Sequence, residues 1–436
     1  MRIRAVFLLL LLAALASAQQ APQQATVWKP VTLADQFFEH NYFNYYAFVN
    51  GVYDSYAPVF NSNGQVVNNG SFGYNVGGGI SGYHAFKDGF FSIAYSGDFR
   101  NSTTYYWGSG TDQNLSMSYL KRINRRWTIN AGTSGGIYFY GTGVNSYLPS
   151  SGTFVQTNPF STETKFLGAG LTLSYQQSRH LSYVVSGNFF LQRFNYPGSI
   201  GTTGGSGTGS IVYRVSPRLT IGGSYSHSYF GYQLNAGNAV VNGYYGNMSY
   251  AFPKHWFVNA SAGVNHSDTV GVASLPVSLI IQTPNGPQTV GGYVLGRYES
   301  TANLPAFSVG VSRVYRTSSF SVSGGQAIVS GNGYYLASNS LFFAGVYSRT
   351  LRTKRANLSI SGNYNRFHSV ANTVGVDYST AGIGASYGYN IFRHVSANFR
   401  YDFIRYGNLA PYNAVNDNRL SFGFSFSSQR IPLTIY

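Results

Sequence analysis

A histidine, a serine and an asparagine follow one another at two-residue intervals late in the chain, as His394, Ser396 and Asn398. On a β-strand this spacing places the three side chains on one face. A His and a Ser two residues apart on a strand, with an Asn nearby, are the residue types of a phospholipase-type site. The pattern of those enzymes is His-x-Ser-Asn-Gly, whereas this chain has His-Val-Ser-Ala-Asn and begins it at an expected turn. We interpret the trio as a polar strand end, not as a catalytic site.

The other residues that could support catalysis or bind a metal are dispersed along the chain. The 12 acidic and 8 histidine residues form no pair with metal-ligand spacing, and Cys is absent. Four aspartates in expected loops offer oxygen ligands for Ca²⁺, but no calcium-loop pattern surrounds them: Asp54, Asp98, Asp112 and Asp377. Phosphate-loop and dinucleotide-binding patterns are also missing. The sequence therefore predicts neither an enzyme nor a cofactor or metal site.

The elements that carry these residues are long strands of alternating polarity. Residues 166–194 read FLGAGLTLSYQQSRHLSYVVSGNFFLQRF, in which large apolar residues alternate with Gly, Ser, Thr, Asn and Gln on both sides of the turn at 177–180. Alternation with a period of two places one set of side chains on each face of a strand. Each half of this hairpin exceeds ten residues, the length that a tilted strand needs to cross a bilayer. The segment predicts a transmembrane β-hairpin.

The rest of the chain consists largely of copies of this hairpin. We expect eighteen strands, with sixteen or twenty left open, at 42–53, 70–85, 89–100, 112–122, 126–140, 164–177, 180–193, 207–216, 218–230, 239–252, 255–266, 304–315, 318–330, 337–349, 354–367, 376–391, 393–406 and 417–428. Tight turns near Asp88, Ile123, Arg179, Pro217, Lys254, Arg316, Thr353 and Arg393 alternate with longer loops rich in Gly, Asn, Ser and Thr. The longest expected loop, 267–303, contains a hairpin around Pro284-Asn285-Gly286-Pro287; the count becomes twenty if that hairpin joins the wall.

The first 41 residues divide into two expected parts. Basic residues at Arg2 and Arg4, an apolar run from 5 to 15 and Ala16-Ser17-Ala18 form the pattern of a secretory signal peptide at 1–18. Residues 19–41 are expected to be a periplasmic segment, and the sequence leaves open whether it plugs the barrel or meets a partner. The remainder, 42–436, is the expected barrel.

Charge is scarce but clearly placed. Only 9% of residues are charged, 17% are aromatic, and the formal net charge is +16. Many Lys and Arg residues lie in or beside the expected short turns: Lys121, Arg122, Arg125, Arg126, Arg179, Arg218, Lys254, Arg313, Arg316, Arg349, Arg352, Lys354, Arg355 and Arg393. At that position they would meet phospholipid headgroups on the periplasmic side. We therefore expect no nucleic-acid binding.

With its signal peptide, alternating strands, short turns opposite long loops and aromatic residues near both strand ends, the chain resembles bacterial outer-membrane β-barrel proteins, in particular the porin-like ones. The resemblance covers 42–436 and is architectural; it indicates no subfamily. It implies an all-β, antiparallel, up-and-down transmembrane barrel in the bacterial outer membrane, with short periplasmic turns and longer extracellular loops. Such barrels usually end in an aromatic residue that the insertion machinery reads, here Tyr436. In the residues before it, Pro432 and an inverted alternation require a bulge or an extended tail.

The expected function is passive diffusion of small hydrophilic solutes or ions through a wet lumen. Arg400 and Asp402 share the inward parity of Ser396 and Asn398 and are the first candidates for lumen charges that set ion selectivity. Further candidates of this kind are Arg100, Asp98, Arg297 and Glu299. Residues 141–163 and 267–303 are long enough to fold inward as a constriction. The expected partners are outer-membrane lipids, the barrel-insertion machinery and small solutes, and assembly as a homotrimer is left open.

Two alternatives remain at this stage. Arg400 and Asp402 could form an ion pair in the wall without a role in transport. The whole chain could also be a non-channel barrel that acts in envelope assembly, polysaccharide export or surface attachment. An open lumen would favour the channel, whereas a filled lumen would favour the envelope role.

Overall fold

A computed structural model describes most of the chain. The described residues are 41–55, 58–60, 66–68, 70–102, 110–139, 146–148, 153–155, 163–195, 200–283, 286–330, 336–351, 355–370, 378–407, 415–428 and 431–432. The expected signal peptide and nearly all of the N-terminal segment, as well as Tyr436, lie outside these ranges. Their assignments stay predictions.

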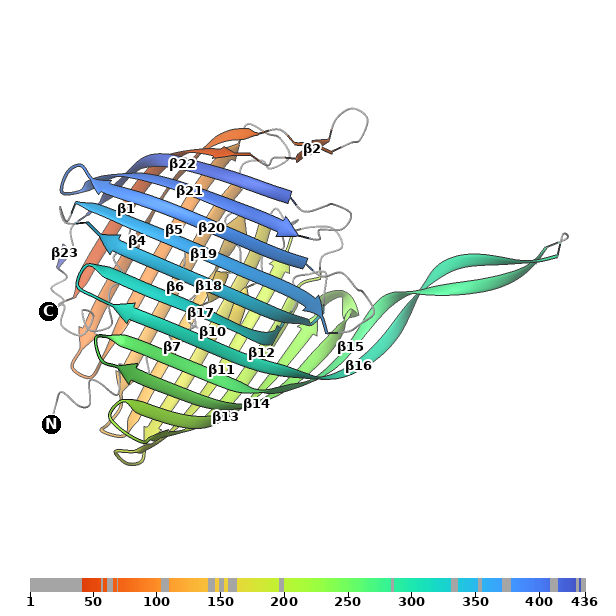
Figure 1. Cartoon of the computed structure of the whole chain (residues 1–436), viewed down its shortest axis with the longest axis horizontal. Coiled ribbons are helices and arrows are strands. Elements are labelled where there is room, and N and C mark those ends of the chain that lie inside the picture. Colours follow the sequence, from red (N-terminus) through yellow and green to blue (C-terminus); the bar gives the residue numbers. More distant parts are fainter. Residues whose placement is uncertain are drawn as a thin grey trace.

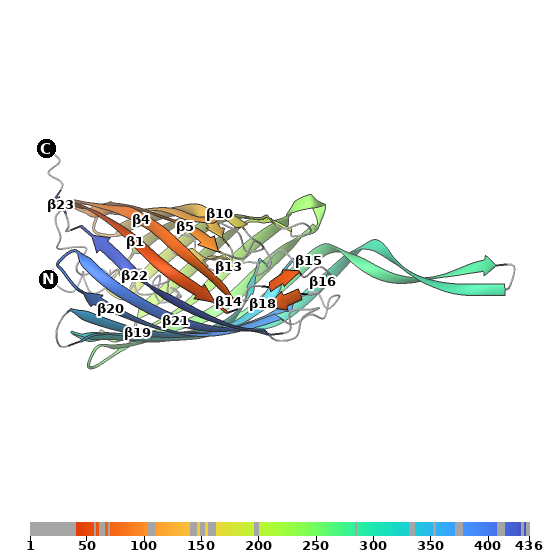
Figure 2. The ribbon, with the colours of Figure 1, turned by 90° about the horizontal axis from the view of Figure 1, so that it is seen from above.

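The described residues form a closed antiparallel barrel of eighteen strands (Figures 1 and 2). Strands neighbouring in sequence pair with one another all the way round, and β22 pairs with β1 to close the ring. The barrel strands are β1 (Tyr42–Asp54), β4 (Ser71–Phe86), β5 (Gly89–Ser102), β6 (Gly110–Arg122), β7 (Trp127–Phe139), β10 (Glu163–Gln176), β11 (Leu181–Phe194), β12 (Thr202–Arg214), β13 (Leu219–Tyr232), β14 (Gly237–Phe252), β15 (Trp256–Thr283), β16 (Gly286–Val314), β17 (Ser318–Val329), β18 (Ser338–Thr350), β19 (Ala356–Ser369), β20 (Tyr378–Asn390), β21 (Val395–Gly407) and β22 (Val415–Ser427). The predicted fold class and the central estimate of eighteen strands are confirmed.

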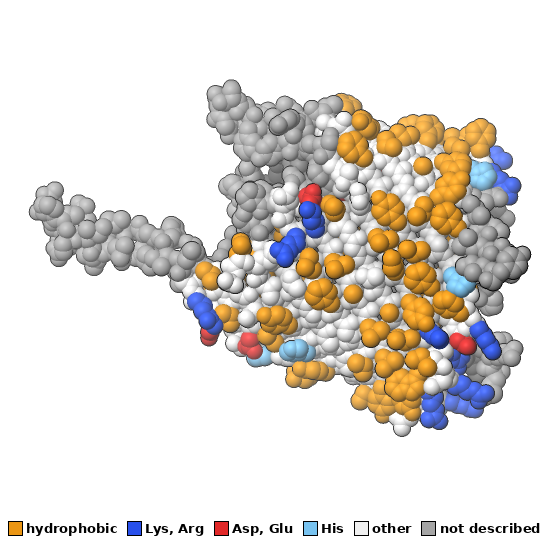
Figure 3. Space-filling view, turned by 180° about the vertical axis from the view of Figure 1, so that it is seen from behind, with side chains coloured by type: hydrophobic (Ala, Val, Ile, Leu, Met, Phe, Trp, Pro, Cys, Tyr) orange, Lys and Arg blue, Asp and Glu red, His pale blue; other side chains and the backbone are white. Residues whose placement is uncertain are grey.

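Alternation along each strand separates an apolar outer face from a polar inner face. Ile221, Tyr225 and Tyr229 are exposed on the outside of β13, while Thr220 on the same strand is buried on the inside. On β22, Phe422 keeps 54% of its surface exposed although it is a large apolar residue. Figure 3 shows such side chains spread over the barrel wall. A soluble fold would cover these groups, so this surface is the lipid-facing band of a transmembrane barrel.

The short connections lie together at one end of the barrel, the turn end, and the remaining connections lie at the other, the loop end. All of the predicted turns except the one at Thr353, which lies outside the described residues, are present. Several share one design, in which the side-chain oxygen of a turn residue accepts the amide hydrogens two and three residues later. Asn124, Ser178 and Ser216 do this at 2.8–3.2 Å. Local side-chain acceptors of this kind favour tight turns.

The hairpin of β15 and β16 departs from the sequence prediction. Residues 267–303 were expected to be a loop, one able to fold inward, but both strands continue through them and pair from Trp256–Arg313 to Thr283–Gly286. The hairpin therefore leaves the barrel and projects far beyond the loop end (Figures 1 and 2). It adds no strand to the wall, so the alternative count of twenty is wrong. The physical reason is that extended pairing satisfies the backbone hydrogen-bonding groups of this stretch without a separate loop.

The C-terminal strand shows the irregularity expected from its sequence. Ser427 pairs with Tyr46 in β22, whereas Ile431 in β23 (Ile431–Pro432) pairs with Phe43. The register thus shifts by one residue between them, which is a β-bulge. Of the two expected explanations, a bulge or an extended tail, this offset in register agrees with the bulge.

The remaining elements are small. Two short ribbons lie in connections at the loop end, β2 (Pro58–Phe60) with β3 (Val66–Asn68) and β8 (Ser146–Leu148) with β9 (Thr153–Val155). A single 3₁₀ turn, η1 (Gln233–Asn235), links β13 to β14. Within the described ranges no helix has the length and apolar character needed to span a bilayer.

Candidate functional site at the loop end of the lumen

Charged side chains gather on one side of the lumen, near the loop end. Strand pairing carries the inward parity of Arg400 to neighbouring strands, because residues directly opposite each other share a face. The inward-facing charges of β21, β22, β1, β5 and β6 in this region are Arg400, Asp402, Asp417, Arg419, Asp54, Asp98, Arg100 and Asp112. We call these eight residues the charged wall.

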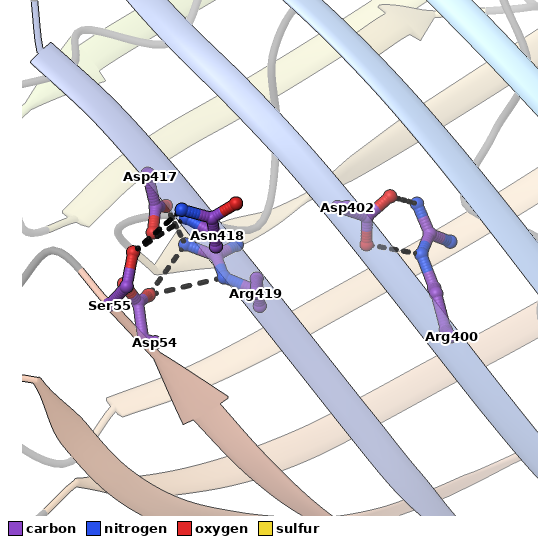
Figure 4. Close-up of polar contacts among 7 residues, drawn as sticks. All are labelled: Asp54, Ser55, Arg400, Asp402, Asp417, Asn418 and Arg419. Carbon is purple, nitrogen blue, oxygen red and sulfur yellow. Dashed lines mark hydrogen bonds and ion pairs between the residues drawn. The ribbon is translucent and has the colours of Figure 1, made fainter.

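Arg419 is the centre of the charged wall at the seam between β22 and β1 (Figure 4). Its Nε and Nη2 donate to Asp54 Oδ2 at 3.1 and 2.8 Å, and Nη2 also reaches Asp417 Oδ2 at 3.3 Å. The Arg419 side chain is 12% exposed and that of Asp417 only 3%. One guanidinium thus holds two carboxylates in a largely dry setting, where charge-assisted hydrogen bonds are strong.

Beside this seam, Arg400 and Asp402 form a pair within β21 (Figure 4). Arg400 Nε donates to Asp402 Oδ2 at 2.6 Å and Nη2 donates to Oδ1 at 2.8 Å. This two-point geometry fixes both side chains along the inner face. Arg400 is 32% exposed, so it is considerably wetter than Arg419.

The third group lies on β5 and β6. Asp98 is directly opposite Asp112 across the strand pair, and Asn75 of β4 donates a hydrogen bond to Asp98. Arg100 lies two residues further along β5. It interacts electrostatically with Asp54, Asp98, Asp112 and Arg419. Gly77 stands opposite Asp98 on β4, where a Cβ atom would overlap the Asp98 side chain. The glycine leaves the room that Asp98 occupies.

An apolar cluster lines the other side of the lumen. Its buried members are Phe190, Phe230, Tyr232, Ala239, Val241, Leu336, Ala337 and Val370, which we call the apolar wall. Those in β11, β13 and β14 share the inward parity of their strands. In the ring order, β14 lies halfway round the barrel from β1. The apolar wall therefore faces the charged wall across the lumen.

The apolar wall includes an inward-packed segment. Leu336 and Ala337, which precede β18, are 7% and 2% exposed and belong to the cluster. A Cβ at inward-facing Gly271 of β15 would overlap the Leu336 side chain, so Leu336 lies on the inner surface of the wall. The amide of Val370 donates to the Ala337 carbonyl at 3.0 Å and holds the segment there. The lumen is thus narrowed from this side at the loop end.

The structure brings four of the six predicted site residues into the charged wall and separates the other two. Arg400, Asp402, Asp98 and Arg100 face the lumen, whereas Arg297 and Glu299 pair with each other at 3.2 Å on the outer face at the base of the projecting hairpin. Their side chains are 70% and 71% exposed. Whether any of them sets selectivity stays a prediction.

Sequence reasoning missed half of the charged wall. Asp54 and Asp112 were considered only as loop ligands for Ca²⁺, and Asp417 and Arg419 were not singled out. A signal was present, since Arg419 has the same parity as the inward Ser421 and Ser425. What parity could not supply is the closure of β22 on β1, which brings Arg419 to Asp54.

The catalytic and metal hypotheses find no support in local geometry. Ser396 Oγ lies 2.7 Å from Ser425 Oγ, and Asn398 donates to the same Ser425 oxygen at 2.9 Å. His394 Nδ1 instead lies 3.0 Å from the Ser427 carbonyl oxygen, at the turn end. In the part of the chain that the structure describes, no group of three or more His, Asp or Glu residues could hold a metal ion.

Comparisons with known proteins add resemblance at the level of solved structures only. No family model matches the chain, and no curated protein matches its sequence. Pseudomonas aeruginosa OccK2 (OpdF), solved in complex with glucuronate, aligns with a TM-score of 0.42 and 11% identity over 90% of this chain and 100% of its own. A BenF-like porin from Pseudomonas fluorescens Pf-5 aligns with a TM-score of 0.42 and 10% identity over 90% of this chain and 100% of its own. P. aeruginosa OpdK, solved with vanillate, aligns with a TM-score of 0.41 and 9% identity over 88% of this chain and 99% of its own.

Proposed function

We propose that this protein is an outer-membrane channel through which small hydrophilic solutes or ions diffuse passively. The observation that carries the proposal is the closed ring of eighteen strands with an apolar outer face and a polar inner face. A barrel of about this size leaves room for water in its interior. The charged wall and the apolar wall then line this path near the loop end.

The inner face is suited to water for most of its circumference. Many inward positions outside the two walls are occupied by Ser, Thr, Asn and Gly, for example Ser186 and Asn188 on β11 and Ser206 and Thr208 on β12. Such groups exchange hydrogen bonds with water at little cost, whereas a filled core would need apolar packing. This supports a wet lumen and passage by size.

The experiment that tests the proposal is single-channel recording of the refolded protein in a planar bilayer. Stable open steps are the expected result. Silence from protein that is shown to be folded and inserted would contradict the proposal. Folding is checked independently by a heat-sensitive mobility shift on gels and by a β-rich circular dichroism spectrum.

A second candidate is surface attachment, and the projecting hairpin favours it. The two strands pair with each other through residues 272–283 and 286–297, beyond the part of β15 that pairs with β14. Deleting 273–296 separates the two candidates: a channel would keep its conductance, whereas an attachment protein would lose binding to cells or envelope material. Signal-peptide cleavage after Ala18, recognition of Tyr436 by the insertion machinery and assembly as a homotrimer belong to the same proposal and rest on the sequence pattern.

A further inference from the structure

We propose that the channel prefers cations and that Asp98 and Asp112 are its main selectivity-determining residues. This inference rests on the proposed channel function and specifies its substrate class: inorganic cations and small solutes that carry an ammonium or guanidinium group.

The charged wall has a net negative charge. It contains five aspartates and three arginines, so its formal charge is −2. Arg419 is committed to Asp54 and Asp417, and Arg400 to Asp402. Neither guanidinium is left to attract an anion from the lumen. The surplus is negative.

One of these negative charges belongs to the group of Arg419 with Asp54 and Asp417, and the other belongs to the group of Arg100 with Asp98 and Asp112 on β5 and β6. Asp98 and Asp112 are directly opposite neighbours, a placement in which like charges repel unless a cation joins them. Arg100 is the basic residue of these strands that lies nearest to Asp98 in sequence, and it also interacts electrostatically with Asp54. In the described structure the Arg100 Nε atom has no hydrogen-bond partner. Asp98, Asp112 and Arg100 together therefore carry a formal charge of −1.

The connections at the loop end contain no basic residue. Residues 55–70, 103–109, 140–162, 195–201, 233–236, 273–295, 330–337 and 408–414 contain no Lys or Arg, and 370–377 contributes only Asp377. However these segments are arranged, they cannot neutralise the charged wall. A cleft with low-dielectric walls and charge of one sign raises the local concentration of the opposite ion.

The basic residues of the chain act elsewhere. At the turn end, Arg122 donates to the Asn124 carbonyl at 3.2 Å, and Arg214 donates to the Ser216 and Pro217 carbonyls at 3.3 Å. Arg179 and Arg218 are exposed on the rim. Exposed charges are screened within about 8 Å at physiological salt. The narrowed loop end, where Leu336 packs inward, therefore dominates the choice between ions.

The test is the reversal potential of the full-length refolded channel under a KCl gradient at low ionic strength. The variants are wild type, the double substitution Asp98→Asn with Asp112→Asn, and the control Glu299→Gln, which removes an acid from the outer face at the same end. We expect a cation-selective wild type and control, and a cation-to-anion permeability ratio lower by about threefold in the double variant. Asp112→Asn alone serves if the double variant does not fold.

Each outcome is decisive. A wild type without preference, or one that prefers anions, overturns the inference while its open steps still support the channel. A cation-selective wild type whose ratio is unchanged by Asp98→Asn with Asp112→Asn overturns the assignment to these residues. Folded and inserted protein that shows no current contradicts the proposed channel itself, and the inference falls with it.

Discussion

The charged wall and the apolar wall lie at the same end of one lumen, on the same kind of strand, yet they are built in opposite ways. The charged wall joins residues far apart in sequence, since Asp54 and Arg419 are 365 positions from each other. The strand residues of the apolar wall come mainly from the successive hairpins β11 to β14, and the inward segment Leu336–Ala337 completes it. Backbone pairing is similar in both, so side chains at inward positions decide what each wall does.

This contrast separates two functions of an inner face. The apolar wall presents a packed apolar surface on the inner face, because its members bury one another. The charged wall is partly exposed to solvent, as the exposure of Arg400 shows, and it gives this part of the lumen a net charge. One wall is expected to govern size and the other charge.

Arg419→Met should be the most damaging substitution in the charged wall. It leaves Asp54 and the buried Asp417 without their shared cation, and an uncompensated buried charge costs about 3 kcal/mol or more. The measurement is the urea midpoint of unfolding in detergent micelles. Arg400→Met is the matched control, with an expected loss of about 1 kcal/mol because its pair is more exposed. Equal losses would refute the central role of Arg419.

Phe230→Ala should weaken the apolar wall without changing the sign of selectivity. Phe230 is buried on the inner face, and removing such a ring costs about 3 kcal/mol. The control is Tyr229→Ala at the adjacent outer-face position. A smaller loss of stability is expected there because the Tyr229 side chain is exposed on the outside of the barrel. Unfolding midpoints give the stability, and the reversal potential gives the selectivity. A change of ion preference in Phe230→Ala would show that the two walls are not separate in function.

Gly423→Ala should strain the seam that carries the charged wall. A Cβ at this inward position would overlap the Val49 carbonyl oxygen and the Asn50 side chain, so β1 and β22 would have to separate slightly. Overpacking of this kind costs about 1–3 kcal/mol. Gly207→Ala on β12 is the control, since nothing lies within 4 Å of its Cβ position. If both variants unfold at the same urea concentration as the wild type, β1 and β22 do not pack as closely at Gly423 as described.

A disulfide across the seam should form without loss of stability. Val52 and Ser421 are directly opposite, and the backbone hydrogen bonds at Ser55 and Tyr45 imply that this pair lies at a non-hydrogen-bonded position, where Cα atoms are about 4.5 Å apart. Because the chain has no cysteine, Val52→Cys with Ser421→Cys gives a clean background. Oxidation should remove both thiols, as measured by thiol titration. The shifted pair Tyr53→Cys with Ser421→Cys should retain them.

The barrel itself could be predicted from the sequence because its signals are local. Period-two alternation, as in 166–194, and turn residues such as Ser178 and Ser216 act within a few positions. The hairpin around Pro284-Asn285-Gly286-Pro287 was predicted, but the continuation of its strands into the barrel wall was missed because Ser, Pro and Gly in 267–303 weaken the alternation although pairing continues. Once that stretch was treated as a loop, the outward parity that Arg297 and Glu299 share with Phe307 and Val309 could not be applied.

The candidate site could be predicted only in part, for a different reason. Parity placed Arg400 and Asp402 on an inner face, and Asp98 and Arg100 were further candidates for the lumen. It could not show that Asp98 meets Asp112, or that Arg419 meets Asp54, because register and barrel closure depend on strand pairing between distant segments. The inward packing of Leu336 is likewise a tertiary contact, for which no local pattern exists.

The most direct test of the contrast between the two walls is the rate at which single cysteines in each wall react with small thiol reagents of opposite charge. Ser96 and Ser228 are equivalent positions, each two residues before a defining residue, Asp98 or Phe230, on the same inner face. The account predicts that Ser96→Cys reacts faster with the cationic reagent than with the anionic one, by a ratio clearly above that of Ser228→Cys. Equal ratios at the two positions, or a preference for the anionic reagent at Ser96→Cys, would contradict it.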